Sequence, residues 1–155
     1  FFALVPRRLS YIYKRELHRL PIFGWGLASL GMFSVDRSEG RTAFERMKRE
    51  VPDFFAHGWA LVLFPEGTRT APGASVKYKT GGVRLAIATN APIVPIALNS
   101  GECWPKYSFL LYPGTIKVVF GDPISPEGKT PHELNEEVRS EIEGEMKLIS
   151  PKYYK

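Results

Sequence analysis

The residues with the clearest capacity for chemistry lie in one short block, residues 64–69, with the sequence Phe-Pro-Glu-Gly-Thr-Arg. A carboxylate, a glycine, a hydroxyl and a guanidinium follow one another at Glu66, Gly67, Thr68 and Arg69. Arginine presents a rigid fork of N–H donors that matches a phosphate, and glycine lets a backbone approach a ligand closely. The block therefore indicates an anion-binding site, although a strand, a turn and a surface ion pair would produce the same pattern.

An apolar run immediately precedes this block. Residues 59–63 read Trp-Ala-Leu-Val-Leu, which predicts a buried strand over residues 59–64. In open α/β sheets, ligands bind at the carboxyl ends of the strands. The polar block therefore falls where a ligand site is expected.

Length and composition indicate a single globular domain. The chain has 155 residues, of which 44% are hydrophobic and 24% charged. The single cysteine, Cys103, excludes an internal disulfide and suits a reducing compartment. No stretch approaches the ~18 apolar residues of a membrane span. Because the chain begins at Phe1 without a methionine, we expect its true N-terminus to lie upstream.

The positive charge is concentrated in the first third of the chain. The net charge is +5, and residues 1–50 hold ten Lys and Arg against five Asp and Glu. A basic surface interleaved with aromatic residues can attract nucleic acid, anionic lipid or a phosphorylated small molecule. No nucleic-acid-binding module is recognisable, so nucleic acid is not an expected partner. An ordinary solvated face remains the alternative.

Strand and helix patterns alternate along the chain, which predicts an α/β fold with a mixed, partly parallel sheet flanked by helices. The predicted strands cover residues 9–13, 32–35, 59–64, 93–98 and 115–120. The predicted helices cover residues 39–57 and 82–89, with a short one within residues 21–28 and a last one after Thr130.

Local signals define several of these elements. The apolar face of the helix at 39–57 is predicted to consist of Phe44, Met47, Val51, Phe54 and Phe55. Its expected N-cap is Ser38, with Glu39 in the first turn, its stop is Gly58, and Pro52 should kink or interrupt it. Asn90 should end the helix at 82–89, and Pro95 should force an edge or a bulge. Thr130 and Glu133 have the spacing of a capping box.

On these motifs the chain resembles the glycerolipid acyltransferase family, and most closely its bacterial 1-acylglycerol-3-phosphate acyltransferases. The block at 64–69 resembles the family's third motif, residues 31–37 its second, and Val94-Pro95 its fourth. The likeness extends through residues 13–17, 21–25, 94–101, 113–116 and 118–123.

The family's first motif, a His followed five residues later by an acid, is not found where the family would place it. By the family's spacing, this His belongs roughly eight residues before Phe1. The expectation is a single acyltransferase domain over residues 1–155 that lacks its N-terminal segment and carries no catalytic residue. None of His18, His57 and His132 replaces the missing His; His132 has Glu137 at the right offset only by accident.

The resemblance assigns substrate-binding roles rather than catalytic ones to this chain. Lys14, Arg37 and Arg69 would surround the phosphate of a lysolipid, with Lys14 and Arg69 converging on one hollow. Glu66 would hold Arg69 or hydrogen-bond the glycerol. Gly67, Thr68 and Pro95 complete the expected site.

Each of these residues also has a plainer reading. Lys14 could be a solvated strand end, and Asp36-Arg37 a local ion pair. Lys77 and Lys79 are expected to be solvated rather than ligating. Ser100 and Cys103 have no recognisable His partner, and the family forms no covalent enzyme intermediate.

The implied reaction moves an acyl group from acyl-CoA or acyl-carrier protein, as co-substrate, to the sn-2 hydroxyl of 1-acylglycerol-3-phosphate, giving phosphatidic acid. No metal or bound cofactor is implied. The alternatives are acylation of another lysolipid, such as an ornithine lipid, and a non-catalytic phospholipid-binding module. The expected location is the cytoplasmic face of the bacterial inner membrane, with the N-terminal aromatic and basic residues facing lipid.

Overall fold

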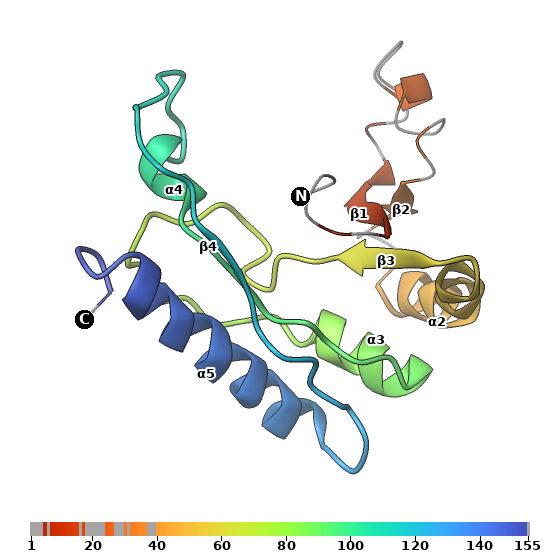
Figure 1. The fold of residues 1–155 in the computed structure, drawn as a ribbon. Coiled ribbons are helices and arrows are strands. Elements are labelled where there is room, and N and C mark those ends of the chain that lie inside the picture. Colours follow the sequence, from red (N-terminus) through yellow and green to blue (C-terminus); the bar gives the residue numbers. More distant parts are fainter. Residues whose placement is uncertain are drawn as a thin grey trace. The chain divides into compact units, whose positions relative to one another are not determined.

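The structure is a computed structural model that describes residues 5, 7–15, 17, 24–26, 30, 32–36 and 40–154. The chain forms two compact units, Phe1–Leu63 and Phe64–Lys155 (Figure 1). The expectation of one domain over residues 1–155 stays a prediction. The α/β class is confirmed, since strands and helices alternate along the chain.

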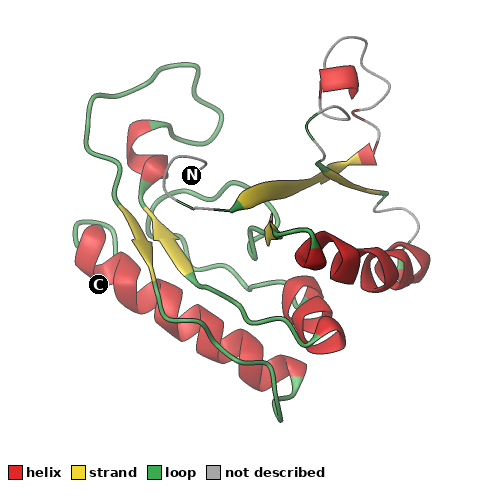
Figure 2. Ribbon diagram, turned by 45° about the vertical axis from the view of Figure 1, so that its right-hand side comes forward, coloured by secondary structure: helices red, strands yellow, loops and turns green. Residues whose placement is uncertain are grey.

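The first unit contains a parallel three-stranded sheet. Its strands are β1 (Arg8–Lys14), β2 (Phe33–Val35) and β3 (Trp59–Val62), in the order β2-β1-β3. Figure 2 draws the strands in yellow and the helices in red. Leu9 pairs with Ala60 of β3, and Lys14 pairs with Val35 of β2. The strand predicted at 59–64 is present but ends at Val62, and it is half-buried rather than buried.

Helix α2 (Arg41–Ala56) connects β2 to β3 and packs against the sheet. Ala43, Met47 and Val51 are its buried residues. The Phe54 ring meets Phe33 edge-on, at 5.4 Å between ring centroids. The predicted apolar face is therefore correct at Met47 and Val51, while Phe44, Phe54 and Phe55 are only partly buried.

The ends of α2 differ in part from the expected signals. The N-cap is Gly40, two residues after the predicted Ser38, which lies with Glu39 outside the described residues. Pro52 does not interrupt the helix, because it lies on the exposed side and only one backbone hydrogen bond is forfeited there. Gly58 adopts the left-handed conformation at φ +77° and its N–H donates to the Phe55 carbonyl at 3.0 Å, so the predicted stop is confirmed.

The second unit contains an antiparallel strand pair, β4 (Ile96–Leu98) and β5 (Val118–Phe120). An isolated bridge joins Ile93 to Ile124, so Pro95 interrupts the strand predicted at 93–98, as its missing N–H requires. Pro95 is buried, and its carbonyl accepts from the Gly121 N–H at 2.9 Å. The strand predicted at 115–120 pairs only over its last three residues.

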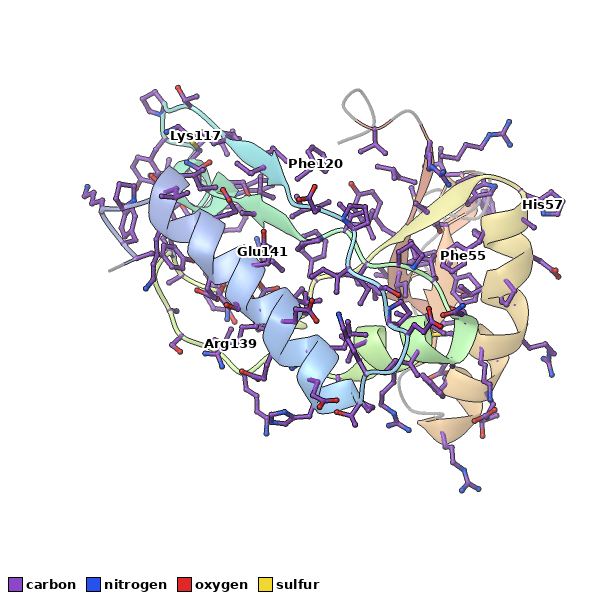
Figure 3. The ribbon with its side chains drawn as sticks, turned by 60° about the horizontal axis from the view of Figure 1, so that its bottom comes forward. Phe55, His57, Lys117, Phe120, Arg139 and Glu141 are labelled. Atoms are coloured by element: carbon purple, nitrogen blue, oxygen red, sulfur yellow. The ribbon has the colours of Figure 1, made fainter. Side chains whose placement is uncertain are left out.

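Three helices complete the second unit: α3 (Gly81–Thr89), α4 (Ser100–Cys103) and α5 (Pro131–Ile149). Val83 and Ala86 of α3 pack against Leu134 and Val138 of α5, and these four side chains form the core of the unit. Helix α5 also packs on β4 and carries Arg139 and Glu141 along its length (Figure 3). Asn90 ends α3 in the left-handed conformation, as predicted.

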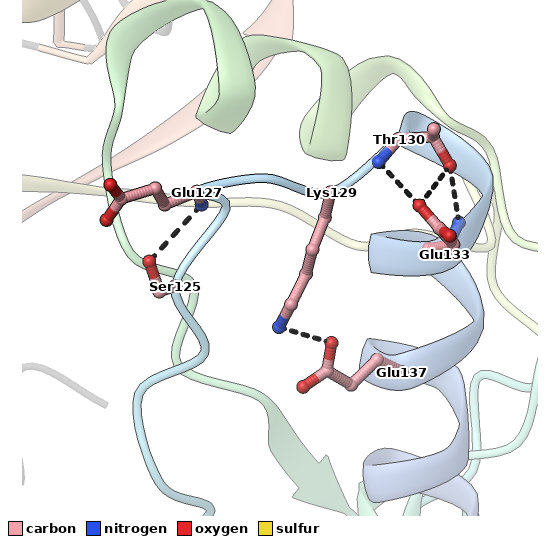
Figure 4. A network of polar contacts seen from close by, with 6 residues as sticks. All are labelled: Ser125, Glu127, Lys129, Thr130, Glu133 and Glu137. Carbon is pink, nitrogen blue, oxygen red and sulfur yellow. Dashed lines mark hydrogen bonds and ion pairs between the residues drawn. The ribbon is translucent and has the colours of Figure 1, made fainter.

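The start of α5 is a complete capping box (Figure 4). The Thr130 hydroxyl accepts from the Glu133 N–H at 3.3 Å, and the Glu133 carboxylate accepts from the Thr130 N–H at 2.8 Å. Lys129 forms an ion pair with Glu137 one turn further along. The sequence prediction for this helix start is confirmed.

Candidate functional site

The Glu-Gly-Thr-Arg block forms a tight turn at the beginning of the second unit. The Gly67 N–H donates to the Phe64 carbonyl at 3.0 Å, and Gly67 has φ +68°, which favours glycine. The Lys79 N–H donates to the Pro65 carbonyl at 2.8 Å, which ties the following loop to the turn. A Cβ atom on Gly67 would lie 2.8 Å from the end of the Lys79 side chain. The end of the exposed Lys79 side chain therefore lies beside the glycine in this structure.

Glu66 is half-buried beside a second carboxylate. Burial raises the pKa of Glu66, a backbone hydrogen bond offsets part of the rise, and the nearby Glu143 carboxylate adds to it. The buried Tyr78 hydroxyl donates to Glu143 Oε1 at 3.1 Å. Burial, followed by the charges of Glu143 and Glu66, raises the pKa of Tyr78 as well. The result is a polar cluster, Glu66–Tyr78–Glu143, behind the turn.

Arg69 lies outside this cluster and lines a pocket of about 440 Å³. Its side chain is exposed, and no described carboxylate forms an ion pair with it. Of the two roles expected for Glu66, the ion pair with Arg69 is therefore not formed in this structure, where Glu66 is half-buried near Glu143 and Arg69 is exposed. Its hydrogen bond to the glycerol stays a prediction. An unpaired guanidinium with its donors exposed can bind an external anion.

The other walls of the pocket are mainly apolar and come from a single stretch of chain. They are supplied by Ser100, Cys103, Trp104, Leu111, Tyr112, Pro113, Gly114 and Ile116. A cation at one side and apolar walls at the others match an amphiphilic anion, with its charge at Arg69 and its hydrocarbon along the walls.

Of the remaining predicted site residues, Lys14 and Arg37 are not fully described by the structure. Lys14 ends β1 opposite Val35, but its side chain lies outside the described part of the chain, as does all of Arg37. Convergence of Lys14 and Arg69 on one hollow therefore stays a prediction. Thr68 is exposed beside Arg69, whereas Pro95 is buried in the contact with Gly121.

The two described histidines, His57 and His132, do not line the pocket beside Arg69. His57 is exposed after α2, where its ring Nδ1 lies 2.7 Å from the Asp53 carbonyl. His132 is exposed in the first turn of α5, and Glu137, which has the motif spacing, instead pairs with Lys129. His18 lies outside the described residues.

Sequence reasoning missed two residues near Glu66, namely Tyr78 and Glu143, and the position of Lys79 beside Gly67. Lys79 was expected to be solvated, and it is exposed, yet its chain covers Gly67. Tyr78 and Glu143 are 65 positions apart. No local sequence pattern predicts such a pair, because the sequence of a helix does not show which glutamate will meet a tyrosine from another segment.

Comparison with known proteins assigns the family. Residues 1–99 match the family model described as Acyltransferase, which covers more than half of the chain. The chain belongs to the acyltransferase family. The matched residues include the Glu-Gly-Thr-Arg turn and the Val94-Pro95 pair.

Three curated relatives, from a bacterium, a plant and a fungus, share the same protein name. A Pseudomonas aeruginosa protein, 1-acyl-sn-glycerol-3-phosphate acyltransferase, is 39% identical over 146 residues, covering 92% of this chain and 57% of its own length. Proteins with the same description from Cocos nucifera and Saccharomyces cerevisiae are each 30% identical, covering 85% and 94% of this chain. These matches cover 43% and 50% of the two relatives. The chain thus spans about half the length of the curated relatives it matches.

A solved structure confirms the fold. The crystal structure of the 1-acyl-sn-glycerophosphate (LPA) acyltransferase PlsC from Thermotoga maritima aligns with a TM-score of 0.75 and 23% identity. The alignment covers 90% of this chain and 56% of that one. Among the residues described here, no helix is both long enough and apolar enough to cross a membrane.

Proposed function

We propose that this protein acylates the sn-2 hydroxyl of 1-acylglycerol-3-phosphate and so produces phosphatidic acid. Membership of the acyltransferase family and the shared description of the relatives support the reaction. As acyl donor we propose acyl-CoA or acyl-carrier protein, with no metal or bound cofactor. We place the reaction at the cytoplasmic face of the bacterial inner membrane.

The observation that carries the proposal is the exposed Arg69 beside an apolar pocket. A phosphomonoester carries roughly −1.5 to −2 charge near neutral pH. Its oxygens match the guanidinium fork, while the single acyl chain of the substrate matches the walls at Trp104, Leu111 and Ile116. Lys14 and Arg37 would add charge around the same phosphate.

In the proposed reaction, the contribution of this chain is to position the substrate. The substrate hydroxyl attacks the thioester carbonyl carbon, its proton passes to a histidine base oriented by a carboxylate, and the thiolate leaves and takes up a proton. We propose that this base is none of the histidines in the 155-residue chain. Holding the phosphate at Arg69 fixes the distance and direction of the hydroxyl, which lowers the entropic part of the barrier.

Substitution of Arg69 tests this role in the protein expressed from its complete gene. We expect Arg69→Ala to lower kcat/KM for 1-acylglycerol-3-phosphate by about 10–100-fold, because a hydrogen bond to a charged group contributes about 1.5–3 kcal/mol. Arg69→Lys should recover only part of the loss, since it keeps the charge but not the fork. The matched control is Arg49→Ala, an exposed arginine on α2 whose loss should leave the rate unchanged.

The same assay separates the alternatives. Faster acylation of a phosphate-free lysolipid, such as a lyso-ornithine lipid, would contradict the assigned head group. Binding of 1-acylglycerol-3-phosphate with no transfer from either thioester would contradict catalysis and favour a phospholipid-binding module. An Arg69→Ala rate equal to that of the unmodified protein would contradict the phosphate role of Arg69.

A further inference from the structure

The segment between α4 and β5 exposes a large apolar surface. In residues 104–116, called the apolar loop from here on, seven large side chains are more than half exposed. They are Trp104, Tyr107, Phe109, Leu110, Leu111, Tyr112 and Ile116. Phe109 is fully exposed, and Leu110 and Leu111 are 67% and 70% exposed. Contiguous exposed apolar residues mark an interaction site, whereas scattered ones are ordinary.

Hydrogen bonds hold the apolar loop in shape. The Trp104 Nε1–H donates to the Ser108 carbonyl at 2.9 Å, and the Leu110 N–H donates to the Ser108 hydroxyl at 3.0 Å. The Tyr112 N–H donates to the Cys103 carbonyl at 2.8 Å and closes the base of the loop. These bonds fix the backbone around Ser108, while the large apolar side chains of the loop remain exposed.

The charges on this segment select the kind of partner. Residues 103–121 contain two lysines, Lys106 and Lys117, and no aspartate or glutamate. Lys106 Nζ lies 5.0 Å from the centroid of the Tyr107 ring, and Lys117 is exposed just before β5 (Figure 3). Aromatic rings and lysine side chains together suit the interface of a bilayer, where rings enter the headgroup boundary and ammonium groups meet anionic lipid.

The apolar loop also continues into the pocket beside Arg69. Trp104, Leu111, Tyr112 and Ile116 belong both to the exposed surface and to the pocket lining. A lysolipid leaving a bilayer along this surface would keep its acyl chain in apolar contact until its phosphate reached Arg69.

We propose that the apolar loop inserts into the interface of an anionic lipid bilayer and passes the lysolipid substrate to the pocket. The passage of substrate rests on the proposed function, whereas insertion itself does not. This contact is separate from the N-terminal aromatic and basic residues that the sequence predicted to face lipid. Among those residues, Trp25 is described and is exposed.

A fluorescent probe tests insertion without any use of activity. In the protein expressed from its complete gene, Cys103, the only cysteine of the 155 residues given, and any cysteine elsewhere are replaced by serine, and an environment-sensitive dye is attached at Phe109→Cys. The matched control carries the dye at Leu148→Cys, because Leu148 on α5 is also 71% exposed. Vesicles of phosphatidylglycerol with phosphatidylcholine should shift the emission of the Phe109 dye to the blue. The Leu148 dye should not respond, and vesicles of phosphatidylcholine alone should produce a smaller shift.

A second measurement uses vesicle sedimentation. The triple variant Phe109→Ser, Leu110→Ser, Leu111→Ser should bind phosphatidylglycerol vesicles at least about tenfold more weakly, while Leu148→Ser should bind as the unmodified protein does. An unchanged Phe109 dye on bound vesicles would overturn the proposal. So would a dye already shielded from iodide before vesicles are added, since another part of the protein or a second copy would then cover the loop. Insertion without acyl transfer would instead count against the proposed function alone.

Discussion

Glu66 is the residue whose surroundings depart most from what its sequence position indicates. The motif places it three residues before Arg69, where an ion pair is the simplest expectation. It is instead half-buried and near enough to Glu143 for that carboxylate to raise its pKa further, and Glu143 accepts a hydrogen bond from Tyr78. Burial and a nearby carboxylate both raise the pKa of such a group, so the stability of the fold depends on pH at this point.

The sign of that dependence follows from the direction of the pKa shift. The folded state holds the Glu66 proton to a higher pH than the unfolded state, so stability falls as pH rises from the ordinary value of 4.5 through the raised pKa. Because glutamine does not titrate, the Glu66→Gln protein should not lose stability in this way as the pH rises. We expect the free energy of unfolding of Glu66→Gln, relative to the unmodified chain, to increase over that window. Denaturant unfolding at several pH values measures it, and a difference that stays constant with pH would contradict the argument.

Gly67 supports a second prediction at the scale of one residue. Its φ of +68° disfavours any L side chain, and a Cβ there would meet the Lys79 side chain at 2.8 Å. We expect Gly67→Ala to lower the free energy of unfolding by about 1–2 kcal/mol. Gly144→Ala is the control, because Gly144 lies within α5 with open space around it and should gain about 0.5–1 kcal/mol. Equal effects of the two substitutions would show that the left-handed conformation of Gly67 is not important.

At the scale of elements, α5 is the clearest case of a helix defined by its own sequence. Thr130, Pro131 and Glu133 satisfy or remove the free N–H groups of its first turn, so the start is set before any packing occurs. Its buried side, including Leu134 and Val138, then packs against α3. Helix α2 differs, because it has no side-chain cap and carries Pro52, and it is held by the packing of Met47, Val51 and Phe54.

Removal of the cap should therefore weaken the second unit measurably. We expect Thr130→Ala to cost about 1 kcal/mol in the free energy of unfolding, because the Glu133 N–H loses its acceptor and Glu133 loses a donor. Ser140→Ala, at an exposed position in the middle of α5, is the matched control and should be neutral or slightly stabilising. A Thr130→Ala protein as stable as Ser140→Ala would mean that packing alone defines the start of α5.

At the scale of the whole molecule, substrate binding by this chain can be tested apart from catalysis. The described residues supply a cation, an apolar pocket and an exposed apolar loop. From the family resemblance, we propose that none of the histidines of this chain is the general base. We therefore expect the purified 155-residue chain to show no acyl transfer to 1-acylglycerol-3-phosphate while retaining weak affinity for it. Radiolabelled acyl-CoA incorporation measures transfer, and any rate above the uncatalysed background would contradict this expectation.

The amino-acid sequence by itself determined the local elements, the family motifs and the candidate residues. Capping at Thr130, the stop at Gly58 and the interruption at Pro95 depend on neighbours a few positions away, so they can be recognised without a fold. The family motifs identify Arg69 in the same way, because they are contiguous in the chain.

Only the tertiary structure decided what surrounds those residues. The partnership of Tyr78 with Glu143, the crossing of Lys79 over Gly67 and the wall that residues 100–116 build beside Arg69 join positions distant in sequence. Such contacts arise from how helices and loops pack, and a buried carboxylate has the same sequence signature as an exposed one. Burial and charge proximity, which set the pKa of Glu66 and leave Arg69 unpaired, exist only once the chain is folded.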